Sequence, residues 1–282
     1  MVKAFGIDTW IYSILPPSEA IKRIKSQGLD VVEYCYDHFR NLENESMDIT
    51  ETCRQVVEVA NSYDVKAIQV HGPFGRFDVE LASSDHSVRK KALDRAKMWM
   101  ELTSLLGADV LVLHTAIVEE DILEGNNAMF EKARKSNLEA FRDLDKLARE
   151  EGVKVAIENR LEKIFAWRPV DLVEFINALN SDYMGICLDV GHANVNGIKA
   201  AEMVEIMRDL IIATHLHDND GFSDQHLPPL MGCIDWEALV KALGRYPYPL
   251  ILEIRDAKDI KIDENNLTLS KVAMDHLFSK AG

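Results

Sequence analysis

Short apolar segments alternate with longer amphipathic segments along the chain, and this alternation indicates how the chain folds. The short segments are rich in β-branched residues and carry Gly, Pro or ionisable residues at their ends, a pattern typical of buried strands. They predict eight β-strands, over residues 4–8, 30–34, 66–70, 109–113, 153–157, 185–188, 211–213 and 249–252.

The segments between these strands place apolar residues three and four positions apart, which predicts helices with one buried face. Pro17 and Ser18 suit the start of the first helix, and Gly28 suits its end. The expected helices cover residues 17–28, 49–63, 87–106, 126–151, 169–179, 198–207, 236–243 and 266–280.

Strands that alternate with helices pair in parallel, because each helix carries the chain back across the sheet. Eight such units predict an α/β fold, a single (β/α)8 TIM barrel over residues 1–282, with an open doubly wound sheet as the alternative. A barrel of this kind has about 250 residues, and no linker-like run of Pro, Gly or Ser divides this chain. We therefore expect one domain.

Ionisable residues stand where six of the predicted strands end. In a barrel, the carboxyl ends of all strands meet at one mouth, where barrel enzymes carry their catalytic residues. An open sheet would instead spread these side chains along an edge, so their positions favour the barrel. The six residues are His71, His114, Glu158, Asp189, His215 and Glu253.

The stretch THLHDNDGFSDQHLPPLMGCIDW, residues 214–236, concentrates further histidines and carboxylates. His215 and His217 are two apart after an apolar run, so a strand would point them to opposite sides, one inward and the other bracing it. Asp224 and His226 form a second such pair, in a loop. Imidazole and carboxylate groups are ordinary ligands of zinc, manganese and iron.

Each of these residues also has a structural interpretation. Glu158 could pair with Arg160, and Glu253 with Arg255, in both cases two residues along the chain, while Asp189 could cap a turn. Together, however, they would crowd the mouth with carboxylates, and burying several negative charges without a cation is costly. The set as a whole therefore predicts a divalent metal site, with Mn²⁺ or Zn²⁺ first and Co²⁺, Fe²⁺ or Mg²⁺ also possible.

Composition and charge exclude several classes of function. The formal net charge of −15, without a basic strip, makes a nucleic acid an unlikely partner. The four cysteines form no CxxC pair and indicate neither a disulfide framework nor a thiolate zinc site. No stretch approaches the roughly 20 apolar residues of a membrane span, and the N-terminus carries no targeting signal, so we expect a cytoplasmic protein.

These residues, in this order, resemble the xylose isomerase-like barrel superfamily, which contains endonuclease IV and the sugar and sugar-phosphate isomerases and epimerases. The resemblance rests on the motifs LDVGHAN, HLHDND and DQH together with His71, His114, Glu158 and Glu253, and covers nearly the whole chain. It implies a common metal site formed by Glu158, Asp189, His215 and Glu253. Endonuclease IV holds two further zinc ions, whose ligands would match His71 and His114 for one ion and His192, Asp224 and His226 for the other. The resemblance thus implies one to three ions.

Two departures favour the isomerase-type members over the nucleases. Glu158 is followed by Asn159, Arg160 and Leu161 rather than by a small, Gly-bearing loop. His217 stands where the nucleases carry Asn, and the segment HLPPLMGCIDW is similar to that of isomerase-type members.

The resemblance and the two glutamates together predict an isomerase or epimerase of a sugar, sugar phosphate or small hydroxy-keto compound. Glu158 and Glu253 would exchange a carbon-bound proton through an enediolate, and His217 would lie near the substrate oxygens or behind His215. The further substrate-binding candidates are Trp10, Glu33, Arg160, Trp167, Asp218 and Arg255.

Three alternatives stay open. The first is a dehydratase with the same metal chemistry, the second is a trinuclear zinc phosphodiesterase acting on abasic DNA, and the third is a metal-stabilised binding protein without turnover. We expect a small carbohydrate as the partner in carbohydrate metabolism, no membrane, and self-association.

Overall fold

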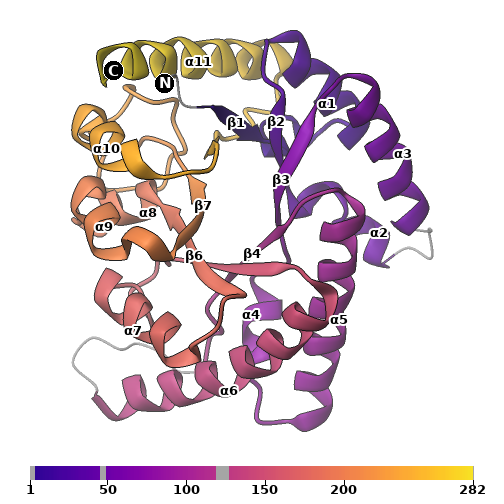
Figure 1. Ribbon diagram of the computed structural model, residues 1–282, viewed down its shortest axis with the longest axis vertical. Helices are drawn as coiled ribbons and strands as arrows, with labels where there is room; N and C mark the ends of the chain where they lie inside the picture. The colour runs from indigo at the N-terminus through magenta and orange to yellow at the C-terminus, as the bar shows by residue number, and fades with distance from the viewer. Residues whose placement is uncertain (1–3, 45–48, 119–126, 282) are drawn as a thin grey trace.

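The computed structural model describes residues 4–44, 49–118 and 127–281. Eight parallel strands form a ring that is surrounded by helices (Figure 1), which confirms the predicted single (β/α)8 barrel. The strands are β1 (Phe5–Asp8), β2 (Val31–Tyr34), β3 (Lys66–His71), β4 (Val110–His114), β5 (Lys154–Glu158), β6 (Met184–Asp189), β7 (Ile211–His215) and β8 (Leu250–Leu252).

The strands pair in the order β7-β6-β5-β4-β3-β2-β1-β8, so each lies beside its neighbours in the sequence. Between the two ends of this order, Leu216 forms a parallel bridge with Leu252. The amide of Leu216 donates to the carbonyl oxygen of Ile251 at 2.9 Å, and that of Glu253 donates to Leu216 at 3.1 Å. These bonds join β7 to β8 and bring the residues that follow both strands to the same mouth.

The long helices agree with the sequence prediction, apart from their ends. They are α1 (Pro17–Ser26), α3 (Ile49–Ser62), α5 (His86–Leu105), α6 (Asn127–Glu151), α7 (Pro169–Leu179), α9 (Ala200–Met207), α10 (Trp236–Ala242) and α11 (Ile260–Ala281). Residue 126, the expected start of the long charged helix, lies outside the described residues.

The start of α11 was predicted six residues too late. The side chain of Asp259 accepts hydrogen bonds from the amides of Lys261 and Ile262, so it caps the helix ahead of its regular apolar pattern. Three short helices at the mouth were not expected: α2 (Arg40–Asn44), α4 (Arg76–Leu81) and α8 (Val190–Val195). They follow β2, β3 and β6, and α4 and α8 carry residues of the candidate site.

The core has two layers, as a barrel requires. The larger layer packs the outer faces of the strands against the helices, and a smaller apolar group lies within the ring of strands, including Val112, Ala156 and Ala213. Because strands such as β6 are buried on both faces, their sequences read as continuous apolar runs rather than as alternating patterns. Among the described helices, none is both long and apolar enough to cross a membrane.

Candidate active site

A cavity of about 310 Å³ lies at the carboxyl ends of the strands. Of the residues predicted from the sequence, nine line it: Trp10, His71, His114, Glu158, His192, Asp224, His226, Glu253 and Arg255. They come from positions far apart in the chain, and the barrel brings them to one place.

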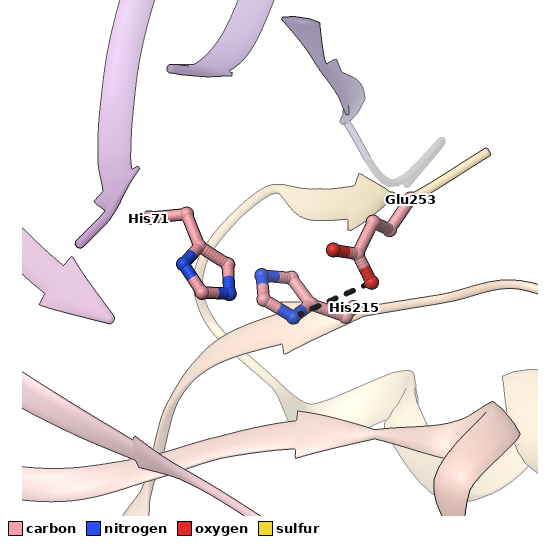
Figure 2. A group of neighbouring side chains, drawn as sticks. All are labelled: His71, His215 and Glu253. Atoms are coloured by element: carbon pink, nitrogen blue, oxygen red, sulfur yellow. Dashed lines mark ion pairs between the residues drawn. The ribbon is translucent and has the colours of Figure 1, made fainter. Parts of the chain in front are cut away.

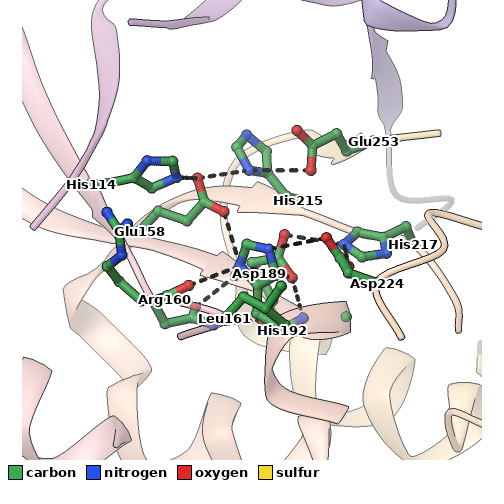
Figure 3. A network of polar contacts seen from close by, with 12 residues as sticks. His114, Glu158, Arg160, Leu161, Asp189, His192, His215, His217, Asp224 and Glu253 are labelled. Atoms are coloured by element: carbon green, nitrogen blue, oxygen red, sulfur yellow. Dashed lines mark hydrogen bonds and ion pairs between the residues drawn. The ribbon is translucent and has the colours of Figure 1, made fainter. Parts of the chain in front are cut away.

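Glu158, the last residue of β5, lies at the centre of the polar network (Figure 3). Its Oε2 atom is 3.2 Å from Nε2 of His114, 3.4 Å from Nδ1 of His215 and 3.5 Å from Nε2 of His71. Its Oε1 atom is 3.2 Å from Nδ1 of His192. The carboxylate is 2 % exposed, and Oε2 has no hydrogen-bond partner among the described residues. One buried carboxylate therefore faces imidazoles from four other strands or their loops.

Three imidazoles of the site have Nδ1 close to a backbone carbonyl oxygen. Nδ1 of His71 lies 2.9 Å from the carbonyl oxygen of the next residue, and Nδ1 of His192 lies 2.9 Å from that of Asn159. Nδ1 of His226 lies 3.1 Å from the carbonyl oxygen of Glu253. A proton on Nδ1 would satisfy each carbonyl and leave the lone pair of Nε2 for a cation, the arrangement that is usual for metal-binding histidines.

His215 has the opposite orientation. Its Nε2 atom lies 2.9 Å from Glu33, which also accepts a hydrogen bond from Gln69 at 3.0 Å. Its Nδ1 atom lies 3.4 Å from Glu158 and 3.7 Å from Glu253, is buried and has no hydrogen-bond partner in the described chain. Figure 2 shows the ring of His71 lying parallel to that of His215, opposite Glu253. Glu33, predicted to bind a substrate hydroxyl, is fully buried and orients His215.

His217 also points into the network rather than behind His215. Its Nε2 atom lies 3.2 Å from Asp189 and 3.8 Å from Asp224, and its ring stacks on His226 with centroids 3.8 Å apart. The two-residue alternation expected for His215 and His217 does not apply, because β7 ends at His215.

Gly191 makes room for His217. A Cβ atom on Gly191 would lie 1.8 Å from Cε1 of His217, so a side chain there would displace the ring. The side chain of Asp189 also accepts the amide of His192 at 2.7 Å, which caps α8 and places His192 at the cavity. The motif around Asp189 is thus both a helix cap and part of the site.

A second group of ligand atoms lies in the loop after β7. Asp224 is 2.9 Å from Nε2 of His226 and 3.5 Å from Nε2 of His192. The backbone of His226 has a φ of 50°, a left-handed conformation that is unusual for residues other than Gly. Such strain is commonly found at functional sites, where surrounding contacts hold the residue in place.

The two glutamates of the cavity differ in their proton affinity. Burial would raise the pKa of Glu158, but the neighbouring His215 and His114 outweigh it and hold the pKa well below its usual range. Burial raises the pKa of Glu253 well above its usual range, because the opposing effect of His215 is too small. In this form of the protein the two carboxyl groups therefore favour different protonation states, as an acid and base pair requires.

The donor set fits a divalent cation. Several sets of three side chains hold ligand atoms within 4.8 Å of one another, among them His71, His114 and Glu158; His71, His215 and Glu253; Glu158, Cys187 and His215; His192, Asp224 and His226; and His217, His226 and Glu253. Buried atoms without a hydrogen-bond partner in the described residues include Oε2 of Glu158, Nδ1 of His215 and Oδ1 of Asp224. An unpaired buried polar group costs about 1–3 kcal/mol, and a cation would satisfy several at once.

Arg160 does not pair with Glu158. Its Nη1 atom donates to Asp78 at 3.0 Å, and its Nε atom donates to Glu162 at 3.1 Å. It is 5 % exposed and does not line the cavity, so neither the proposed salt bridge nor a free substrate clamp agrees with its position.

Asp78, on α4, is fully buried and lies 3.6 Å from Nδ1 of His114. Burial would lower the pKa of His114, but Glu158 and Asp78 outweigh it and raise the pKa to about 9. Asp78 was not predicted from the sequence, because it has no motif around it and lies 82 positions from Arg160.

Two other predicted substrate-binding residues lie outside the cavity lining. Asp218 is fully buried and accepts hydrogen bonds from the amide of Ile234 and from Nε1 of Trp236, so it anchors the loop. The Nζ atom of Lys163 lies over the ring of Trp167, 5.4 Å from the ring centroid.

Trp10 and Arg255, by contrast, line the cavity. The ring centroids of Trp10 and His226 are 5.0 Å apart. Asp8, Tyr36 and Phe74 also line it and were missed. Asp8 is the last residue of β1, so its position at a strand end was a signal that could have identified it.

Comparison with known proteins supports the sequence resemblance. MJ1311 of Methanocaldococcus jannaschii is 25% identical over 257 residues, covering 89% of this chain and 83% of that protein. Inosose isomerase of Bacillus subtilis is 24% identical over 185 residues, which cover 60% of this chain and 62% of that enzyme.

Solved structures share the whole fold. A D-tagatose 3-epimerase-like protein superposes with a TM-score of 0.78 at 24% identity, covering 99% of this chain and 100% of the other. The IOLI protein with a bound zinc atom superposes with a TM-score of 0.75 at 19% identity, and the match covers 99% of both chains. The family description "xylose isomerase-like TIM barrel" matches residues 21–279. The chain therefore belongs to the xylose isomerase-like TIM barrel family.

Proposed function

We propose that this protein is a divalent-metal-dependent isomerase or epimerase of a carbohydrate, acting by proton transfer. The observation that carries this proposal is the arrangement of Glu158 and Glu253 on either side of Nδ1 of His215, at 3.4 Å and 3.7 Å, within one cavity. Each glutamate can both bind a cation and reach a ligand in the cavity.

The ligands would come from the carboxylates and from the imidazole atoms that lack partners. We assign Glu158, Asp189, His215 and Glu253 to a central ion, with His217 beside Asp189 as a further candidate. Bound there, a divalent ion polarises a sugar carbonyl and its neighbouring hydroxyl, which acidifies the C–H bond between them.

The glutamates then move the proton. In its ionised form, Glu158 or Glu253 removes the proton from the carbon, and the other glutamate, on the other side of Nδ1 of His215, returns one. Positioned acid and base groups of this kind contribute about 10²–10⁴-fold to a rate. Return to the opposite face of the same carbon is epimerisation, return to the adjacent carbon is isomerisation, and loss of a neighbouring hydroxyl is dehydration.

The comparisons favour the carbohydrate class. Inosose isomerase and the D-tagatose 3-epimerase-like protein both carry names of sugar or cyclitol chemistry, and the IOLI structure contains zinc. Trp10, Tyr36 and Phe74 add aromatic faces to the cavity lining, which suit the apolar face of a sugar ring.

The test is exchange of a substrate C–H proton with solvent. The metal-loaded protein is incubated with ketoses and inososes in D₂O, and deuterium uptake is followed by NMR. We expect uptake that stops after chelation and falls by at least 100-fold in Glu253→Gln. Absence of uptake from every keto sugar, in protein with confirmed bound metal, would refute the proposal.

A zinc phosphodiesterase is the second candidate, because two additional ligand groups are formed. His71, His114 and Glu158 make one, and His192, Asp224 and His226 make the other, as a trinuclear centre needs. Nicking of an abasic duplex that disappears in Asp224→Ala would support this candidate. Inactivity of fully metallated protein on such DNA would exclude it.

A further inference from the structure

A second cavity, of about 240 Å³, lies beside the metal cavity and shares His226 and Arg255 with it. It lies between the loop that follows β7 and helix α11. Asp218 and Leu227 exchange two backbone hydrogen bonds of 2.8 Å, and the amide of Arg255 donates to His226 at 3.1 Å. The wall between the two cavities is therefore held by backbone contacts on both sides.

The two cavities have opposite chemistry. Among the residues that the structure describes, the metal cavity is lined by five carboxylates, Asp8, Asp37, Glu158, Asp224 and Glu253, and by one Arg or Lys side chain, Arg255. The described lining of the second cavity contains no carboxylate. Its polar side chains other than His226 are Gln225, Arg255 and Asn266, and the rest of its lining is apolar.

These three side chains have donors to offer. The side-chain oxygen of Gln225 accepts a hydrogen bond from the backbone amide of Asp220 at 2.8 Å, which leaves the NH₂ group of Gln225 available. Within residues 4–44, 49–118 and 127–281, no hydrogen bond or ion pair engages the side chain of Arg255 or Asn266. A guanidinium fork and two amides thus line a space several times the roughly 30 Å³ share of one water molecule.

We propose that the second cavity binds an oxyanion substituent of the substrate, a phosphate or a carboxylate, while the reacting carbons lie in the metal cavity. This inference rests on the proposed function and narrows the substrate to acidic or phosphorylated sugars. Arg255 binds the anion bidentately. The carboxylates of the metal cavity repel an anion, so the anionic end of a substrate is directed across the shared wall.

The apolar part of the second cavity leaves an anion few polar partners other than Arg255 and the two amides. Leu227, Pro228, Met231 and Leu269 line the cavity together with Arg255. Met231 and Leu269 are exposed, so the ion pair forms at a solvated surface and its contribution is selectivity. A neutral sugar would leave Arg255 without a partner at this wall and would gain nothing from it.

The experiment compares matched substrates on metal-loaded protein. A ketose is measured against its terminal phosphate and against the keto acid that carries a carboxylate at the same carbon, using solvent exchange of the C–H proton. We expect kcat/KM to be at least tenfold higher for one of the anionic compounds, and the two anionic arms to identify which anion fits. Arg255→Gln should lose about 10- to 100-fold on that anion and a several times smaller factor on the neutral ketose, because Arg255 also lines the metal cavity. Arg255→Lys should recover part of the loss.

Two further variants test the geometry. Asn266 lies on the opposite wall, in α11. Asn266→Leu should lower kcat/KM for the anionic substrate severalfold and leave kcat/KM for the neutral substrate unchanged. Arg245→Gln makes the same charge change in the exposed turn before β8, at the other end of the barrel. It should alter kcat/KM for neither the anionic nor the neutral substrate. Equal kcat/KM for anionic and neutral compounds, or an equal loss on both in Arg255→Gln, would overturn the inference while leaving the proposed function intact.

Binding provides an independent measurement if no exchange is detected. Calorimetric titration of metal-loaded wild type and Arg255→Gln with a sugar phosphate and its parent sugar tests the second cavity without catalysis. Tighter binding of the phosphate that depends on Arg255 supports the cavity even where the proposed reaction fails. Phosphate binding that is the same in both proteins overturns it.

Discussion

The metal cavity and the second cavity adjoin, yet their side chains are held in different ways. In the metal cavity carboxylates and imidazoles face one another, Glu158 and Glu253 are buried, and atoms such as Oε2 of Glu158 are left unpaired among the described residues. In the second cavity the polar groups lie beside apolar side chains, and Arg255 is exposed. Buried unpaired charges are costly, whereas an exposed guanidinium is solvated. We therefore expect a bound cation to stabilise the first cavity, whereas the second adds selectivity for an anionic substrate.

The largest effect is expected from Glu158→Gln, which removes the charge at the centre of the network. Glu158 faces four imidazoles, and without its charge those ligands lose their common partner. We expect cation affinity and C–H exchange to fall by at least 10³-fold, measured by calorimetry and NMR. Glu162→Gln, an exposed change in the following loop, is the matched control and should retain both. Unchanged cation affinity in Glu158→Gln would show that the metal cavity does not depend on a bound cation, and it would remove the difference drawn between the two cavities.

Cation binding should depend steeply on pH. Burial would lower the pKa of His215, but Cys187 and the neighbouring glutamates outweigh it and raise the pKa well above its usual value, so the imidazole must lose a proton before Nδ1 can bind the central ion. Affinity should therefore rise with pH up to that raised pKa, by about tenfold per pH unit for each proton displaced. Calorimetry in buffers of different ionisation enthalpy measures the protons released. The affinity of the second cavity for a phosphate should not rise with pH in this way, after correction for the ionisation of the phosphate itself.

A smaller loss is expected from Asp78→Asn. Asp78 lies beside Nδ1 of His114 and neutralises Arg160, and His114 contacts Glu158, so the charge of Asp78 helps to position this metal ligand through His114. Removing such a partner typically costs 10–100-fold in metal affinity. The control is Asp171→Asn, which breaks a comparable pair with Arg168 on α7, away from the cavity. If both variants bind metal equally well at equal folded fraction, Asp78 is structural only.

The smallest effect is expected from Gly191→Ala. The new methyl group would force the ring of His217 away from Asp189 and Asp224. Overpacking of this kind costs about 1–3 kcal/mol of stability, and we expect a severalfold loss of metal affinity. Gly244→Ala, where a Cβ meets nothing within 4 Å, should be neutral. Thermal melts with and without metal separate the two effects.

The barrel and the central ligands could be predicted because they follow from local patterns. A strand buried on both faces reads as an apolar run, and a polar residue at its end, such as His114 or Glu158, points to the mouth once the strands are parallel. The predicted residues at six strand ends all meet in the network for this reason.

Other features depend on contacts that no local pattern records. The orientation of His217 is set by the chain after β7, where strand periodicity no longer applies, and by the space at Gly191. The pair formed by Asp78 and Arg160 joins helix α4 to the loop after β5, far apart in the sequence, so Arg160 was mistaken for a partner of Glu158 or a free clamp. Glu33 was misplaced because only the fold shows it behind His215.

The most direct measurement is titration of chelator-treated protein with Zn²⁺ or Mn²⁺, followed by calorimetry and metal analysis. The account predicts at least one ion per chain, bound with a micromolar or lower Kd and with proton release, and lost in Glu158→Gln. One ion would favour the isomerase chemistry and three the phosphodiesterase. Wild-type protein that binds no ion more tightly than Glu158→Gln does would contradict the central claim.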